Sequence, residues 1–213
     1  MEVGVRLLDL FCCAGGGAMG YHQAGFDEIV GVDIAPQPRY PFRFVQADAL
    51  EYVAAHGHEF DAIHASPPCQ GYSNTQKLTG NEYPLLIEDV RKALQATGKP
   101  YVIENVPGAP LVNPTTLVGS MFSLMTMRPR LFECSFDVPF MLAPPPSARH
   151  AKMGRQPKNG EYVHVVGHVS NVDYCRSAMG IDWMTREELA EAIPPAYTKW
   201  LGKHLMAALQ VAA

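Results

Sequence analysis

The 213-residue sequence has little charge and no long hydrophobic run. Only 18% of its residues are charged and 47% are hydrophobic, which is typical of a globular protein and excludes a disordered chain. Its apolar runs are too short to cross a bilayer, and the first residues carry an acid and lack the basic region and cleavage site of a signal peptide. We therefore expect a cytoplasmic protein with no membrane partner, made of one domain or of one domain with a small appendage.

Cysteine is also scarce, and its spacing does not favour a structural role. The five cysteines include the adjacent pair Cys12 and Cys13 and form no CxxC motif, so we expect neither a disulfide framework nor a zinc knuckle. His164 and His168 are four residues apart, but they lie in a β-like run without the glutamate of an HExxH motif. We therefore expect no metal centre.

Positive charge is concentrated in one short segment. The net charge is −4, so a role in nucleic-acid binding depends on where the charges lie. The stretch 145–159 contains Arg149, Lys152, Arg155 and Lys158 and no acidic residue. Such a run is most often a solvated loop, although it can also contact phosphates.

The first hundred residues alternate between β-like runs and helical stretches. This alternation predicts an α/β fold with a mostly parallel sheet that is covered on both faces. Over residues 84–98, Leu86, Val90 and Leu94 recur at helical spacing, and Gly98 can end that helix. We expect an α/β core over residues 1–136, a small irregular segment over 137–180, and helices over 181–213 that close the core.

The ends of the predicted strands carry the residues that suit a cofactor. Open α/β sheets bind ligands at the carboxyl ends of their strands. The first strand runs into three consecutive glycines, which allow the backbone to approach a nucleotide-like ligand closely. Asp33 and Asp48 end the second and third strands. Two carboxylates disfavour a pyrophosphate but suit a cationic cofactor with ribose and adenine, such as S-adenosylmethionine.

A thiol and a carboxyl group follow on the next two strands. Cys69 comes after Pro67 and Pro68, which restrict the backbone of its loop, and Glu104 ends the fifth predicted strand. A thiolate is a strong nucleophile at neutral pH, and a nearby carboxyl group can protonate or hold a ring nitrogen of the molecule that is attacked. We therefore expect both groups in one catalytic site.

Together these stretches resemble the motifs of the DNA cytosine-5 methyltransferases. "LDLFCCAGGGAMGYHQAGF" is similar to their cofactor loop, "SPPCQGYS" to their catalytic Pro-Cys loop, "ENV" to their glutamate motif and "MRPRLF" to their paired-arginine motif. "TREELAEAIPPAYTKWLGKHL" resembles a shortened form of their two closing motifs. The resemblance implies a Rossmann-like S-adenosylmethionine-dependent methyltransferase fold, with transfer of a methyl group to C5 of cytosine in double-stranded DNA and release of S-adenosylhomocysteine.

The resemblance also implies roles for the catalytic residues. Cys69 would add to C6 of a cytosine flipped out of the duplex, and Glu104 would bind the N3 edge of that base. Arg130 would contact the carbonyl of the base, and Arg128 would support the loop.

Further residues are assigned to ligands by the same resemblance. The cofactor would be bound by Phe11, Ala14, Gly15, Gly16, Asp33, Ile34, Asp48, Ala49, Pro68 and Leu85. Nucleic acid would be contacted by Ser73, Arg149, Lys152, Arg155 and Lys158. The sequence departs from the family pattern at Cys13, Thr126 and Glu191, where the family usually has glycine, glutamine and asparagine.

The segment 137–180 is far smaller than the target-recognition domain of the family. It is too short for an independent core, so we expect a short target motif and contacts with phosphates. Two alternatives remain open: an RNA cytosine-5 methyltransferase, which uses the same thiol attack, and an inactive homologue that only binds nucleic acid. We expect a monomer in a bacterial or phage-infected cell, of the kind found in restriction-modification systems.

Overall fold

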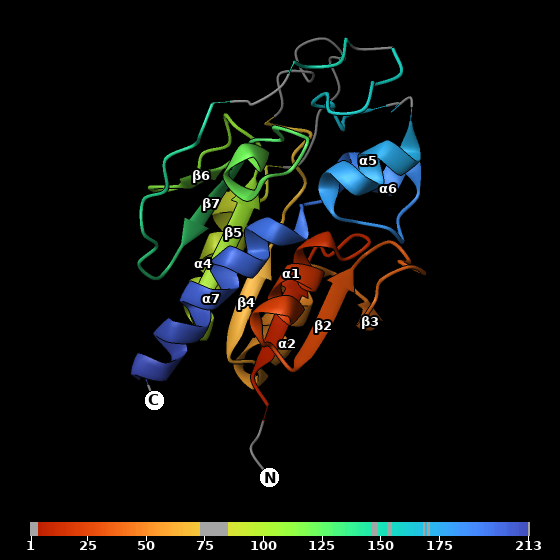
Figure 1. Cartoon of the computed structure of the whole chain (residues 1–213). Helices are drawn as coiled ribbons and strands as arrows, with labels where there is room; N and C mark the ends of the chain where they lie inside the picture. The colour runs from red at the N-terminus through yellow and green to blue at the C-terminus, as the bar shows by residue number, and fades with distance from the viewer. Residues whose placement is uncertain are drawn as a thin grey trace.

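A single mixed sheet forms the centre of the computed structural model, which describes residues 4–72, 85–145, 149–152, 155–167, 169 and 171–212. Within these residues seven strands pair in the order β3-β2-β1-β4-β5-β7-β6 (Figure 1). Strands β1 to β5 are parallel, whereas β7 is antiparallel to both β5 and β6. The strands are β1 Arg6–Leu10, β2 Glu28–Asp33, β3 Arg43–Gln46, β4 Ala62–Ala65, β5 Tyr101–Asn105, β6 Thr115–Leu117 and β7 Arg130–Cys134.

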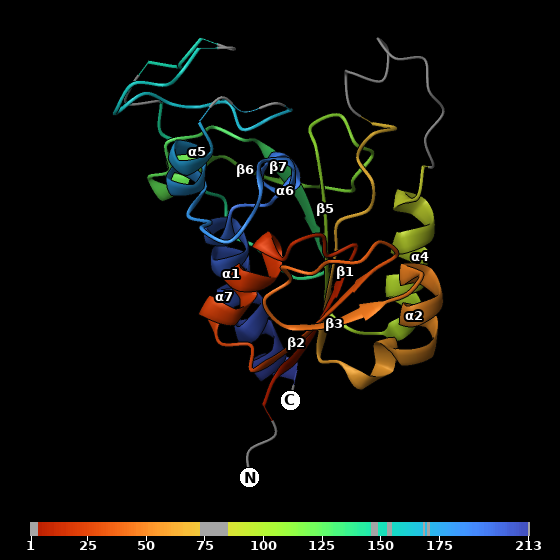
Figure 2. The same cartoon turned by 90° about the vertical axis from the view of Figure 1, so that its right-hand side faces the viewer.

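Helices cover both faces of this sheet, as the alternating pattern predicts. Helices α2 (Ala49–His56) and α4 (Ile87–Thr97) lie on one face, and α1 (Gly16–Ala24) and α7 (Pro195–Ala212) lie on the other (Figure 2). Short 3-10 turns occur at Gly57–Glu59 and Gly119–Phe122. The expected α/β fold with a mostly parallel sheet is therefore confirmed.

Local sequence signals explain the ends of α4. Val90 and Leu94 are fully buried in the core between the helix and the sheet, as their helical spacing predicts. Gly98 follows the helix with a φ of +68°, a conformation that glycine adopts without strain, and its amide donates to the Gln95 carbonyl. No helix of the described ranges is long and apolar enough to cross a bilayer.

Helix α7 packs directly on α1 through glycines. A Cβ atom at Gly20 would lie 2.0 Å from Thr198 Oγ1 and 2.2 Å from the Pro195 carbonyl oxygen. On the other side of the contact, a Cβ atom at Gly202 would lie 2.7 Å from the Ala24 Cβ atom. The two helices can approach this closely only because both positions lack a side chain. The C-terminal helix is thus packed as part of the α/β core.

The segment 137–180 is largely irregular, but it contains one helix that the sequence interpretation missed. Helix α5 (Val172–Met179) begins after Asn171, whose side chain accepts a hydrogen bond from the Tyr174 amide at 3.0 Å. Its apolar side forms a second hydrophobic cluster with Met184 and Leu189, close to helix α6 (Arg186–Glu191). The segment is therefore folded because it shares a core with the C-terminal residues.

Candidate active site

A cavity of about 280 Å³ lies at the carboxyl ends of the parallel strands. It is lined by residues from the loops after β1, β2, β4 and β5 and by residues near α6. Because parallel strands point the same way, the loops that follow them meet at one edge of the sheet. The lining includes Asp9, Phe11, Cys13, Ala14, Gly16, Asp33, Ile34, Pro68, Cys69, Glu104, Arg130, Met184, Glu191 and Ile193.

The loop after β1 has a strained backbone that approaches two neighbouring segments. Phe11 and Cys13 adopt positive φ angles of 56° and 43°, which are uncommon for residues with a side chain. The Cys13 amide donates to Asp33 Oδ2 at 3.1 Å, so the Asp33 carboxylate joins this loop to the end of β2. A Cβ atom at Gly16 would lie 2.4 Å from the Ile193 carbonyl oxygen, which explains the need for glycine there.

The Pro-Cys loop is held at its first residues. The Ser66 amide donates to the Leu10 carbonyl at 3.1 Å, and the Asn105 side chain donates to the Pro67 carbonyl at 2.9 Å. Cys69 is half-buried and lines the cavity. Burial and, to a smaller extent, the charge of Glu104 raise the pKa of its thiol, so the thiol is protonated in the resting protein.

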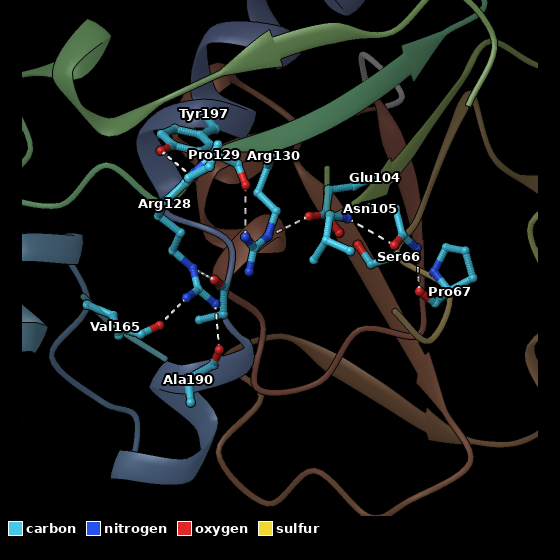
Figure 3. A network of polar contacts seen from close by, with 12 residues as sticks. Ser66, Pro67, Glu104, Asn105, Arg128, Pro129, Arg130, Val165, Ala190 and Tyr197 are labelled. Atoms are coloured by element: carbon cyan, nitrogen blue, oxygen red, sulfur yellow. Dashed lines mark hydrogen bonds and ion pairs between the residues drawn. The ribbon is translucent and has the colours of Figure 1, made fainter. Parts of the chain in front are cut away.

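Glu104 lines the same cavity as Cys69 and forms an ion pair with Arg130. Arg130 Nε is 3.0 Å from Glu104 Oε1, and the two side chains are only 13% and 8% exposed (Figure 3). Burial raises the pKa of Glu104, although both Arg130 and Arg128 oppose this shift. The carboxyl group can therefore hold a proton more readily than an exposed glutamate and can offer it to a ring nitrogen.

Arg128 points away from Glu104 and binds backbone carbonyl groups (Figure 3). It donates to the Ala192 and Ala190 oxygens, each at 2.7 Å, and to the Val165 oxygen. Burial lowers the pKa of its guanidinium to about 9. Arg128 thus connects the loop before β7 to Val165 and to the cavity-lining residues Ala190 and Ala192. Its supporting role stays a prediction.

Six of the ten predicted cofactor residues line the cavity: Phe11, Ala14, Gly16, Asp33, Ile34 and Pro68. The other four, Gly15, Asp48, Ala49 and Leu85, are not among its lining residues, and their role stays a prediction. Asp48 caps α2, because its Oδ1 accepts from the Leu50 and Glu51 amides at 2.8 and 3.0 Å. Leu85 is 61% exposed.

Two of the three departures from the family pattern lie at the cavity. Cys13 and Glu191 both line it, whereas Thr126 is buried elsewhere. The negative charge of Glu191 contributes to raising the pKa of both Cys13 and Cys69. The Glu191 carboxylate therefore disfavours ionisation of both thiols.

Sequence interpretation missed some lining residues. Asp9 is 2% exposed, accepts a hydrogen bond from the Tyr40 hydroxyl at 3.0 Å, and has its pKa raised by burial to about 8. An acid inside an apolar strand was the available signal for it. No comparable signal existed for Met184 or Ile193, which reach the cavity only through packing.

The predicted nucleic-acid contacts lie in different surroundings. Arg149, Lys152 and Lys158 are exposed, as a surface for phosphates requires. Arg155 instead forms an ion pair with Glu161 at 2.6 Å, an acid just beyond the basic stretch. Ser73 lies outside the described residues. Within the described residues, no group of three or more His, Cys, Asp or Glu side chains could hold a metal ion.

Comparison with solved structures defines the class of this fold. A protein of an Escherichia coli prophage, described as a DNA modification methyltransferase, superposes with a TM-score of 0.68 over 97% of this chain and 99% of its own, at 15% identity. The Dnmt2 methyltransferase of Schizosaccharomyces pombe gives a TM-score of 0.63 over 96% and 99%, at 13% identity. The fold is that of the S-adenosylmethionine-dependent methyltransferases.

Sequence comparison then gives the family. The model of the C-5 cytosine-specific DNA methylase family matches residues 5–117, just over half of the chain, and the chain belongs to this family. It is 34% identical over 118 residues to the Type II methyltransferase M.XorII of Xanthomonas oryzae pv. oryzae, covering 47% of this chain and 28% of that protein. It is 31% identical over 121 residues to M.AquIA of Picosynechococcus sp., covering 48% and 49%. The chain thus spans at most about half the length of these relatives.

Proposed function

We propose that this protein transfers a methyl group from S-adenosylmethionine to C5 of cytosine in double-stranded DNA. The observation that carries the proposal is that Cys69, Glu104 and Arg130 line the same cavity as Phe11 and Asp33. Nucleophile, base-binding carboxyl group and cofactor-binding residues therefore meet in one space. Membership of the cytosine-5 DNA methylase family supports this choice of base and position.

The cavity also fits the charge of the proposed cofactor. Asp9 is neutral at neutral pH because burial raises its pKa to about 8, and Glu104 pairs with Arg130, so Asp33 and Glu191 are the lining carboxyl groups that remain for a cation. Such a lining disfavours a phosphate-containing cofactor and suits a sulfonium cation. Phe11 would pack against the adenine, and Asp33 would accept from the ribose hydroxyls. S-adenosylmethionine would supply an electrophilic methyl group here.

The chain's own residues would perform the remaining chemistry. Cys69 would lose its thiol proton to solvent water when the base enters, and its Sγ would bond to C6 of the flipped cytosine while the electron pair of the C5–C6 double bond moves into the ring. Glu104 would hold N3 and neutralise the charge that develops on the ring, while Arg130 keeps the carboxyl group in place. C5 would then take the methyl group, the C5 proton would leave to a base, and the bond between Sγ and C6 would break.

The proposal is tested by transfer of tritiated methyl groups to duplex DNA, single-stranded DNA and RNA. We expect transfer to duplex DNA, and loss by several orders of magnitude in Cys69→Ser, because a hydroxyl is a poor nucleophile without a base. Cys134→Ser is the matched control and should keep its activity. Transfer to RNA alone, or the same activity in Cys69→Ser, would contradict the proposal, and no transfer to any substrate would favour an inactive homologue.

A covalent trap tests the mechanism separately from turnover. Duplex DNA that contains 5-fluorocytosine cannot lose its C5 substituent, so the adduct should persist and migrate as a protein–DNA complex on a denaturing gel. Peptide mapping should place the link at Cys69, and Cys69→Ser should form none. An adduct at another cysteine would show that the nucleophile has been misassigned.

We also propose that the exposed basic side chains of the segment 137–180 bind phosphates. Phosphate contacts release counterions, so they make affinity depend on salt without reading sequence. Replacing Arg149, Lys152 and Lys158 by Gln should make the plot of log K for duplex binding against log salt concentration less steep. The slope should change by up to about 0.9 for each phosphate contact that is lost. The methylated motif, mapped by bisulfite sequencing, should not change. Lys92→Gln with Lys203→Gln serves as the control, and an unchanged slope in the first variant would refute phosphate binding.

A further inference from the structure

A buried line of polar groups leads from α1 to the active-site carboxyl group. The Tyr21 hydroxyl lies 3.0 Å from His64 Nδ1, and His64 Nε2 lies 2.9 Å from Ser66 Oγ. The Ser66 side chain lies beside Glu104 (Figure 3), both residues line the cavity, and the Ser66 hydroxyl lowers the pKa of the Glu104 carboxyl group. Tyr21 and His64 are 0% and 1% exposed, so water does not interrupt the line at these two residues.

Alternation along β4 places His64 and Ser66 on the same side of the sheet. Residues two apart in an extended chain project in the same direction, so the ring reaches the hydroxyl directly. His64 is the partner of Asp9 in the pairing of β1 with β4. Ser66 also begins the Pro-Cys loop, three residues before Cys69. The line therefore ends at the first residue of the Pro-Cys loop, beside Glu104.

The direction of these hydrogen bonds follows from the histidine. Burial lowers the pKa of His64 to about 3, so its ring is neutral and one nitrogen donates while the other accepts. In one tautomer, Tyr21 donates to Nδ1, Nε2–H donates to Ser66, and the Ser66 hydroxyl remains a donor for Glu104. In the other tautomer, Nδ1–H donates to Tyr21, and Ser66 must donate back to the ring.

The second tautomer leaves a buried proton without an acceptor. The Tyr21 hydroxyl has His64 as its hydrogen-bond partner in the described structure, so its own proton would then be unpaired. Leaving a fully buried donor unpaired is costly, whereas the first tautomer satisfies every member of the line. The arrangement therefore favours the proton on Nε2.

We propose that His64 is a positioning residue that, together with Tyr21, directs the Ser66 hydroxyl onto Glu104. This inference deepens the proposed function, because Glu104 is the group assigned there to the base. With Ser66 and Arg130 as partners, the carboxyl group is restrained in its rotation and keeps its position toward the cavity. His64 itself touches no reacting atom and acts through Ser66.

Other charged and titratable groups face this line from neighbouring elements. Arg130 and Arg128 act on Glu104 from β7 and the loop before it, and both lower its pKa. Asp9 of β1 and Cys134 of β7 act on Tyr21. None of these groups is a hydrogen-bond partner of His64 in the described structure, so the tautomer depends on Tyr21 and Ser66.

The first experiment measures the tautomer in the protein without ligands. Two-dimensional ¹H–¹⁵N spectra of the histidine rings, assigned with His64→Gln, should show a neutral ring protonated at Nε2 between about pH 5 and pH 8. A ring protonated at Nδ1, or a charged ring at neutral pH, would overturn the proposal. This result does not depend on methyl transfer, so it is separate from the fate of the proposed function.

The second experiment removes one hydroxyl at a time. Tyr21→Phe and Ser66→Ala should each lower kcat about tenfold, the effect of one hydrogen bond of about 1.4 kcal/mol, with little change in KM for DNA. Carbon-13 spectra of labelled glutamate should show a raised pKa of Glu104 in both variants. Ser66→Thr, which keeps a hydroxyl, should recover most of the rate.

A matched control separates positioning from a general loss of packing. Tyr101 lies on the same strand as Glu104 and is buried, but its hydroxyl contacts Gln95 rather than this line. Tyr101→Phe should leave kcat and the pKa of Glu104 unchanged. Equal losses in Tyr21→Phe and Tyr101→Phe, or an unchanged Glu104 pKa in Tyr21→Phe, would show that His64 is only a core residue.

Discussion

Replacing Arg128 by methionine should destabilise the protein and weaken its cofactor site together. The guanidinium donates to three backbone carbonyl groups, those of Val165, Ala190 and Ala192. The first belongs to the segment 137–180, and the other two line or adjoin the cavity from the C-terminal side. Arg128 is 5% exposed, so no solvent replaces these contacts when the side chain is shortened.

The magnitude follows from the three hydrogen bonds. A hydrogen bond from a charged donor is worth about 1.5 kcal/mol or more, which gives about 4.5 kcal/mol for three. Methionine recovers about 1 kcal/mol, because it packs well in irregular spaces and removes the cost of burying a charge. We expect a loss of about 3 to 4 kcal/mol in the free energy of unfolding, measured by urea denaturation. The free energy of unfolding of Arg128→Lys should lie between those of the unchanged protein and Arg128→Met, since one ammonium cannot reach all three carbonyls.

The effect on the cavity distinguishes this residue from other buried arginines. Arg91 of α4 is a suitable control, because neither it nor its partner lines the cavity. Its side chain is 11% exposed and forms an ion pair with Glu133 of β7 at 2.8 Å. Arg91→Met should lose comparable stability, yet bind S-adenosylmethionine in calorimetry as the unchanged protein does. Arg128→Met should bind it at least tenfold more weakly. A stability loss below about 1 kcal/mol, or equal binding in both variants, would refute this reasoning.

Three further predictions concern Cys13, Asp48 and Cys69. Cys13→Gly should raise the free energy of unfolding by up to about 1 kcal/mol by relieving a φ of +43°, and an unchanged urea midpoint would contradict this. Asp48→Ala should cost about 1 kcal/mol as a lost helix cap and Asp48→Asn almost nothing; equal losses would contradict a capping role. Because burial and Glu104 raise the pKa of Cys69, its alkylation by iodoacetamide should be slow at neutral pH and should accelerate only at a higher pH than the alkylation of free cysteine does. Glu104→Gln should accelerate the alkylation of Cys69 at a given pH and abolish methyl transfer. If mass spectrometry of the Cys69 peptide shows no faster alkylation in this variant, the effect of Glu104 on the thiol is contradicted.

The grouping of Asp33, Cys69 and Glu104 at one cavity could be predicted from the sequence, because each lies at the end of a predicted strand or shortly after it. Asp33, Cys69 and Glu104 are far apart along the chain, yet the carboxyl ends of parallel strands share one edge, so alternation of strands and helices is enough to bring them together. The glycines of the first loop and the prolines before Cys69 added local constraints that are visible in the residue types themselves. This is why the fold class, and the meeting of these three side chains at one cavity, followed from the sequence.

Other features depended on contacts that no local spacing encodes. The carbonyl groups bound by Arg128 lie 37 to 64 residues later, and Tyr21 is 43 residues from His64. Asp48 comes two residues after the end of β3, close to where the sequence places it, but whether its carboxylate caps a helix or faces a ligand depends on the first turn of α2. A strand or helix follows from short-range periodicity, whereas these partners are chosen by the packing of elements distant in sequence, and only the tertiary structure determines that packing.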